Sequence, residues 1–220
     1  MPMLGLSFIK KKREQFKANK LRKKLSSNIE KQIQFSLPYF LLLVLSTIIS
    51  TLGLIADNPP VVIGSMLISP LIWSVFGLSL GLVTLDLKIF GQALKSFITA
   101  FLIVILVSAV VSKISGISVL TSQIKMRLAP NLVDLLIGLV AGAAGIVALY
   151  YPKASSPLYM TGISIALSLL PSLAVVGIGL SNFDWQVAFL SLILFLTNVI
   201  GVVIASSFVL LLLKFQTIKT

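Results

Sequence analysis

The chain has 220 residues, of which 57% are apolar and only 11% carry a charge. About 25% of the residues of a typical soluble domain are charged. So few charged side chains cannot cover the surface of a water-soluble fold, and the composition therefore excludes one. It predicts an all-α, polytopic integral membrane protein that contacts the lipid bilayer.

The residue types that are missing exclude most catalytic chemistry. The chain contains no Cys and no His, so it has no disulfide, thiol nucleophile, His-ligated zinc or haem, or Ser-His-Asp triad. It has six acidic residues and no nucleotide-binding loop ending in Gly-Lys-Ser or Gly-Lys-Thr. We therefore expect no catalytic residues, no cofactor and no bound metal, and we predict that the protein is not an enzyme.

Residues 1–34 form a basic arm. The net charge is +12, and ten of the 18 Lys and Arg residues precede the first apolar run. Apolar residues recur in the arm at loosely helical spacing, which favours binding along anionic lipid headgroups. The alternative, a nucleic-acid-binding arm, is the interpretation we prefer less. Ser27 and Glu30 have the spacing of a capping box that would start the first membrane helix.

Six apolar runs follow, and each is long enough to cross a membrane. They are Phe35–Ile55, Val61–Leu85, Ala93–Ile114, Leu132–Tyr151, Leu158–Leu180 and Trp185–Phe215. They divide the transmembrane domain, 35–215, into a first triplet (35–114), a polar connection (115–131) and a second triplet (132–215), followed by a tail at 216–220. With the N-terminus inside, 15 of the 18 basic residues fall on the cytoplasmic side. We therefore predict a multi-pass protein of a prokaryotic cell membrane with both termini in the cytoplasm.

The second and fifth runs carry a proline at membrane depth. A proline cannot donate a hydrogen bond to the carbonyl four residues earlier, so Pro70 frees the carbonyl of Met66 and Pro171 frees that of Leu167. Freed carbonyls at this depth must face protein or a wet cavity. Paired interrupted helices in two halves of a chain are typical of transporter sites, and they suggest two inverted three-helix repeats.

These breaks define a candidate substrate or ion site. It comprises Ser65, Met66, Ser69, Pro70, Leu167, Ser168, Pro171 and the mid-membrane amide of Asn198. A monovalent cation or a small neutral solute fits these neutral oxygens, because a divalent cation would require carboxylates. The alternative ligand is an anion held by half-helix N-termini. The alternative without a site is that two kinked helices pack without a cavity.

Four further polar residues are pore-mouth or helix-cap candidates: Asp57, Asn58, Arg127 and Asp134. For Asp134 we favour a helix cap paired with Arg127. Two Gly-x-x-x-Gly faces, Gly77 to Gly81 and Gly138 to Gly142, allow close helix packing and suggest a homo-oligomer.

Several of these motifs occur together in one known family. They are Leu52–Ile55, Val61–Leu71, Arg127–Asp134, Gly142–Gly145, Pro171–Leu180 and Leu194–Asn198. In this order the chain resembles the prokaryotic uncharacterised hydrophobic domain family, domain of unknown function 389. The resemblance implies the architecture and brings no activity with it.

Two hypotheses about function follow. The first is a transporter or channel for a small ion or neutral solute, with its site between the broken second and fifth helices. The second is a non-transporting membrane scaffold that binds a partner through its basic arm.

Overall fold

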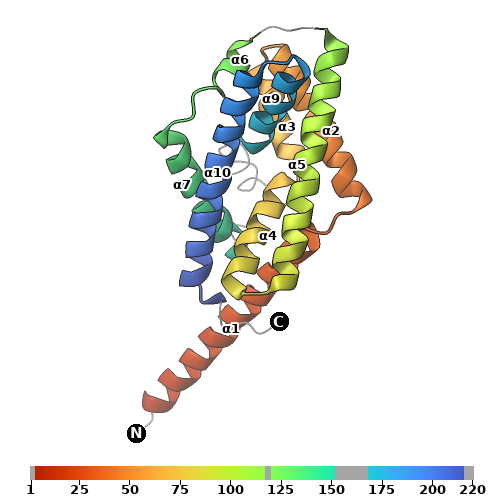
Figure 1. Cartoon of the computed structure of the whole chain (residues 1–220). Coiled ribbons are helices and arrows are strands. Elements are labelled where there is room, and N and C mark those ends of the chain that lie inside the picture. The colour runs from red at the N-terminus through yellow and green to blue at the C-terminus, as the bar shows by residue number, and fades with distance from the viewer. Residues whose placement is uncertain (1–2, 117–119, 152–167, 216–220) are drawn as a thin grey trace.

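The computed structural model describes residues 3–116, 120–151 and 168–215, and within these ranges every regular element is a helix. The helices are α1 (Met3–Gln32), α2 (Leu37–Ile55), α3 (Pro59–Ile68), α4 (Leu71–Thr84), α5 (Leu87–Ser115), α6 (Ser122–Lys125), α7 (Leu132–Tyr150), α9 (Leu169–Ser181) and α10 (Trp185–Leu212). They form one elongated bundle with α6 at one end, while α1 projects from the other (Figure 1).

Four helices, α2, α5, α7 and α10, are long and apolar enough to cross a membrane. The α3–α4 pair passes the same test as one span that is bent by 49°. The outer faces of the bundle carry exposed Leu, Ile, Val and Phe side chains, which lipid covers. The chain is therefore an all-helical, multi-pass membrane protein, as predicted. The first ten residues of the predicted fifth span, 158–167, lie outside the described residues, so a sixth crossing stays a prediction.

Three tight helical hairpins are built in the same way, from a residue with positive φ followed by an Asn or Asp N-cap. Asn58, Asp86 and Asp184 each accept a hydrogen bond from a first-turn N–H of the helix that follows. The residue before each of them, Asp57, Leu85 or Phe183, has a positive φ of 51–58°. The left-handed residue reverses the chain, and the Asx side chain then starts the next helix.

Helix α1 continues to Gln32, so the predicted capping box at Ser27 is wrong. The hydroxyl of Ser26 instead donates 2.6 Å to the carboxylate of Glu30 inside the helix. Leu25 and Ile29 are buried, and α1 contacts α4 and α7. Burial of this face keeps the segment helical past the predicted cap. The first membrane helix is capped by Ser36, which accepts a bond from Tyr39 N.

Helix α9 lies at the centre of the bundle. Every side chain from Leu169 to Gly179 is buried, and the helix contacts α2, α3, α4, α5 and α10. Two of its glycines permit this packing. A Cβ on Gly177 would lie 2.5 Å from the carbonyl oxygen of Ile105 in α5, and one on Gly179 would lie 2.7 Å from the backbone nitrogen of Ala188 in α10.

The Gly-x-x-x-Gly faces are also covered within the chain. A Cβ on Gly142 would lie 2.8 Å from the backbone of Val202, and one on Gly138 would lie 3.1 Å from the carbonyl oxygen of Asn198. A Cβ on Gly81 would meet the backbone of Phe90 at 2.7 Å. These contacts hold α7 against α10 and α4 against α5. The two faces are therefore not free for a second copy of the chain.

Candidate functional site

The second span breaks at Ser69 and Pro70, as predicted. Helix α3 ends at Ile68, Ser69 is extended (φ −67°, ψ 127°), and α4 begins after Pro70. The hydroxyl of Ser69 accepts a 3.4 Å bond from Leu71 N, and no side chain caps the N-terminus of α4. Because Pro70 has no N–H, it cannot bond the carbonyl of Met66.

The predicted break at Pro171 takes a different form. Helix α9 begins at Leu169, so Pro171 is its third residue and lies in the first turn. A proline fits that turn without kinking a helix, because the first-turn N–H groups have no partner within the helix. The chain turn is made by Ser168, whose φ is +44°. Leu167, whose carbonyl we expected to be freed, lies outside the described residues.

The break and the start of α9 lie at similar depth. Asn58, Ser181 and Asp184 mark the helix ends nearest α6. Pro70 is 12 residues after Asn58, Ser168 is 13 residues before Ser181, and Asn198 is 14 residues after Asp184. At 1.5 Å per residue each lies about 20 Å inside the bundle. Helix α9 contacts α3, α4 and α10, so these three points lie at a similar level on helices that pack against one another.

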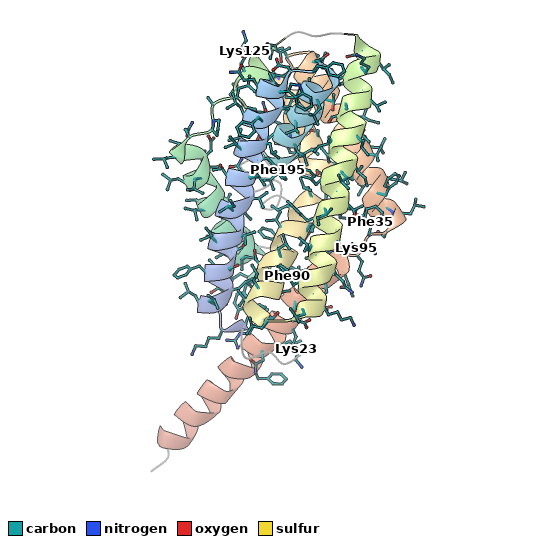
Figure 2. The ribbon with its side chains drawn as sticks, viewed as in Figure 1. Lys23, Phe35, Phe90, Lys95, Lys125 and Phe195 are labelled. Atoms are coloured by element: carbon teal, nitrogen blue, oxygen red, sulfur yellow. The ribbon has the colours of Figure 1, made fainter. Side chains whose placement is uncertain are left out.

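Two packing contacts support this common level. The hydroxyls of Ser74 in α4 and Ser96 in α5 lie 3.0 Å apart. The two helices run in opposite directions, so Pro70, one turn before Ser74, is level with residues 100–101, one turn after Ser96. The ring of Phe101 lies 5.9 Å from the ring of Phe195 in α10. Phe195 lies in mid-bundle (Figure 2) and precedes Asn198 by about one turn, so Asn198 is near the same level.

The predicted site residues differ in what they can offer a ligand. The buried hydroxyl of Ser65 donates 2.6 Å to the carbonyl of Val62 in its own helix, so its proton is already used. Met66 and Asn198 are buried, at 6% and 5% exposure. Among the described residues, the side-chain amide of Asn198 has no hydrogen-bond partner, which leaves its N–H groups and oxygen available. The carbonyl of Ser168 accepts 2.9 Å from the hydroxyl of Ser172.

Three of the four pore-mouth candidates have local structural roles. Asn58 caps α3. Asp134 completes a capping box with Asn131, whose backbone N–H donates 2.9 Å to its carboxylate. The carboxylate of Asp57 accepts 2.8 Å from the backbone N–H of Gln123. That bond, with a 2.7 Å bond from Thr121 Oγ1 to the carbonyl of Leu54, attaches the α6 connection to the end of α2.

Arg127 is the one buried cation of the described region, at 8% exposure. Its guanidinium donates to the carbonyl of Gln123, and its Nε is buried without a partner in the part of the chain that the structure describes. Burial lowers the pKa of Arg127 from its ordinary value to about 10. The predicted helix cap at Asp134 is confirmed, and its carboxylate accepts from the backbone N–H of Asn131 instead of pairing with Arg127. Within the described residues, no cluster of acidic side chains could hold a metal ion.

The sequence interpretation missed a chain of buried hydroxyls. Tyr39 Oη lies 3.0 Å from Ser74 Oγ, which lies 3.0 Å from Ser96 Oγ, and these groups join α2, α4 and α5. Ser79 and Ser206 form a second pair at 2.7 Å between α4 and α10. The available signal was serine inside apolar runs, but the same residue type elsewhere in this bundle merely bonds its own helix, as Ser65 does.

A family model for a domain of unknown function, DUF389, matches residues 66–204, more than half of the chain. The chain belongs to the DUF389 family. It is 33% identical over 162 residues to an uncharacterised protein of the archaeon Methanocaldococcus jannaschii. That match covers 74% of this chain and 50% of the relative, so the chain spans about half the length of the curated relative. No solved structure matches the chain.

The DUF389 match begins at the break and ends in α10. It therefore contains Pro70, Ser168, Pro171 and Asn198, whereas α1 with its basic residues lies before it.

Proposed function

We propose that this DUF389 protein is a transporter or channel for a small solute, with its binding site where the α3–α4 break, the N-terminus of α9 and Asn198 meet. The observation that carries the proposal is the 49° break of an apolar span at Ser69 and Pro70, next to a second helix that starts at the same depth. Interrupted helices at mid-membrane are tolerated where they line a cavity, and they form the binding sites of many transporters.

The ends of the helices favour a solute that accepts hydrogen bonds. Helices α4 and α9 both begin at this level, and neither N-terminus has a side-chain cap. First-turn N–H groups and the helix dipole attract negative charge or an oxygen atom. The four polar candidate residues that the structure describes, Ser65, Ser69, Ser168 and Asn198, include no acid. We therefore propose a small anion or a neutral oxygen-bearing solute ahead of a monovalent cation.

The proposal assigns no catalysis to the chain. Each described acid accepts a hydrogen bond: Glu30 from Ser26, Asp57 from Gln123, Asp86 from Lys88, Asp134 from Asn131 and Asp184 from Val187. None of them is left as a general acid or base in the core.

The test is solute flux into proteoliposomes that contain the purified full chain. A panel of monovalent anions, monovalent cations and small neutral solutes is screened by stopped-flow light scattering and by membrane current. We expect at least one solute to cross faster than in protein-free vesicles, and Asn198→Leu to reduce that flux at least tenfold. Ser79→Ala, a buried change in the same bundle, is the control that leaves flux unchanged. Flux that is equal in Asn198→Leu and wild type contradicts the site.

The scaffold alternative rests on one observation, the projection of α1 from the bundle (Figure 1). Lys20, Lys23 and Lys24 lie exposed on this helix. Truncation of residues 1–19 distinguishes the two functions. Transport predicts that the truncated chain retains flux, whereas a partner-binding scaffold predicts no flux from either form and loss of a cellular phenotype on truncation.

A further inference from the structure

A groove of about 490 Å³ opens where the joint between α1 and α2 meets α5, and its lining includes no residue of the α3–α4 break. It is lined by Ile33, Gln34, Phe35, Gln92, Lys95, Ser96 and Thr99. The lining therefore combines one cation, two amides and two hydroxyls with two apolar side chains, and it contains no acid. Figure 2 shows Phe35 and Lys95 on the same side of the bundle.

The groove lies at the depth of lipid headgroups. Lys95 and Lys113 are 18 residues apart on α5, which corresponds to about 27 Å along the helix. The hydrocarbon core of a bilayer is about 30 Å thick, so the two lysines mark its two boundaries. Leu94 and Ile98, which flank Lys95 on α5, are 38% and 48% exposed and face the acyl chains.

A buried hydroxyl lies at the floor of the groove. Ser96 lines the groove and is 2% exposed. Its Oγ lies 3.0 Å from Ser74 Oγ, which lies 3.0 Å from Tyr39 Oη, and in each pair either oxygen can be the donor. When Ser96 accepts from Ser74, it can donate its own proton to an acceptor in the groove.

A polar stripe leads into the groove. Lys88, Gln92, Lys95 and Thr99 recur along α5 at helical spacing and therefore share one face. The hydroxyl of Thr99 already donates 2.8 Å to the carbonyl of Lys95. A phosphate group matches the remaining donors, because a lysine, amides and the hydroxyl of Ser96 can donate hydrogen bonds to its oxygens. The apolar residues Ile33 and Phe35 match the glycerol and first methylenes of a lipid.

We propose that this groove binds the phosphate of an anionic phospholipid, with Lys95 and Ser96 as its principal donors. The site is distinct from the transport site and from the basic residues of α1. Gln34 and Phe35 belong to the joint between α1 and α2, so a lipid held here contacts the segment that connects the basic helix to the membrane domain.

The experiment is native mass spectrometry of the lipid-depleted full chain in mild detergent. Three probes separate the lipid from its parts: dioleoylphosphatidylglycerol, dioleoylglycerol, which lacks the phosphate, and glycerophosphate, which lacks the acyl chains. High salt, about 0.5 M ammonium acetate, screens the exposed lysines of α1. We expect one tightly retained phosphatidylglycerol per chain and no comparable binding of the other two probes.

Variants then assign the donors. We expect Lys95→Gln to weaken phosphatidylglycerol binding about tenfold and Ser96→Ala about fivefold, the effects of losing a charged and a neutral hydrogen bond. Lys95→Arg should stay close to wild type, and Lys113→Gln, the matched lysine at the other boundary, should leave binding unchanged. Wild-type affinity in Lys95→Gln, or equal binding of dioleoylglycerol, overturns the proposal. Equally tight binding of glycerophosphate makes this a free-phosphate site and overturns the lipid assignment. None of these outcomes depends on whether flux is found.

Discussion

The carboxylate of Asp57 accepts a hydrogen bond from the backbone N–H of Gln123, which lies 66 positions later in the chain. With the bond from Thr121 to the carbonyl of Leu54, it attaches the connection between the two halves to the hairpin of α2 and α3. This attachment forms the α6 end of the bundle.

We expect Asp57→Ala to loosen this connection. The change removes the acceptor of Gln123 N and places Ala at a φ of 51°, which together should cost about 2 kcal/mol of local stability. Amide hydrogen exchange at Gln123 and its neighbours should accelerate about tenfold or more. Asp57→Asn keeps both an acceptor oxygen and tolerance of positive φ, so it should stay close to wild type. Unchanged exchange in Asp57→Ala would show that the bond does not hold the connection.

The two ends of the bundle should face opposite sides of the membrane. Figure 2 shows Lys125 at the α6 end and Lys23 at the α1 end. Because the chain has no Cys, single cysteines can be introduced without background. We expect Lys125→Cys to react with an impermeant maleimide in intact cells and Lys23→Cys only after permeabilisation. The reverse pattern would invert the predicted orientation.

Two glycine-to-alanine changes should differ in their effects on stability. A Cβ at Gly142 would lie 2.8 Å from the backbone of Val202, whereas one at Gly64 would meet nothing within 4 Å. We expect Gly142→Ala to lower the free energy of unfolding by about 1–3 kcal/mol. Gly64→Ala should be neutral or stabilising by up to about 1 kcal/mol. Unfolding in mixed detergent measures both, and equal values would contradict the packing of α7 on α10.

The effect of a glycine substitution on stability should be opposite at Ser168 and at a serine within a helix. Its φ of +44° suits Gly, so Ser168→Gly should keep or raise stability, while Ser168→Val should lower it by about 1–2 kcal/mol. At Ser172, inside α9, Gly should instead cost about 1 kcal/mol. A loss of stability in Ser168→Gly as large as that in Ser168→Val would contradict the left-handed turn.

Arg127 provides a test by pH. Its pKa is lowered to about 10, so its charged form is less stable in the folded state. This cost is constant below that pH and is relieved as the pH rises above it. Between pH 6.5 and 9.5 the stability of the wild type should therefore depend little on the titration of Arg127. The same desolvation would lower the pKa of a lysine at this position below its ordinary value of about 10.4 and toward this pH range. The melting temperature of Arg127→Lys should then rise relative to wild type between pH 6.5 and 9.5. A constant difference would show that the site is solvated.

The sequence predicted Pro70 correctly and Pro171 only in part, for a physical reason. A proline deep in an apolar run removes one helical hydrogen bond, and this predicts an irregularity at either position. It does not distinguish a break within a helix from the first turn of a new one, because proline fits both. The feature that decides between them, the left-handed conformation of Ser168, is carried by a residue type with no strong preference for it.

Contacts between distant segments account for the other differences. Ser27 and Glu30 satisfy the pattern of a capping box, but Leu25, Ile29 and Ile33 form a buried face that favours the continued helix. The groove beside Lys95 depends on the packing of α5 against the joint of α1 and α2, and no local pattern predicts it. Composition and helical length, by contrast, predicted the membrane class and most span boundaries, because these depend on the thickness of the bilayer.

The glycines of α4, α7, α9 and α10 lie against backbone or side chains of the same chain, and this limits how two copies could associate. A neighbouring copy would meet the branched and aromatic side chains of α5 and α7, such as Leu102, Leu106 and Val140. Helices that meet through such residues stay about 8–10 Å apart. Acyl chains cover the same side chains with nearly the same chemistry. Any self-association would therefore be governed by dilution in the bilayer. The associated fraction would fall as the ratio of lipid to protein rises.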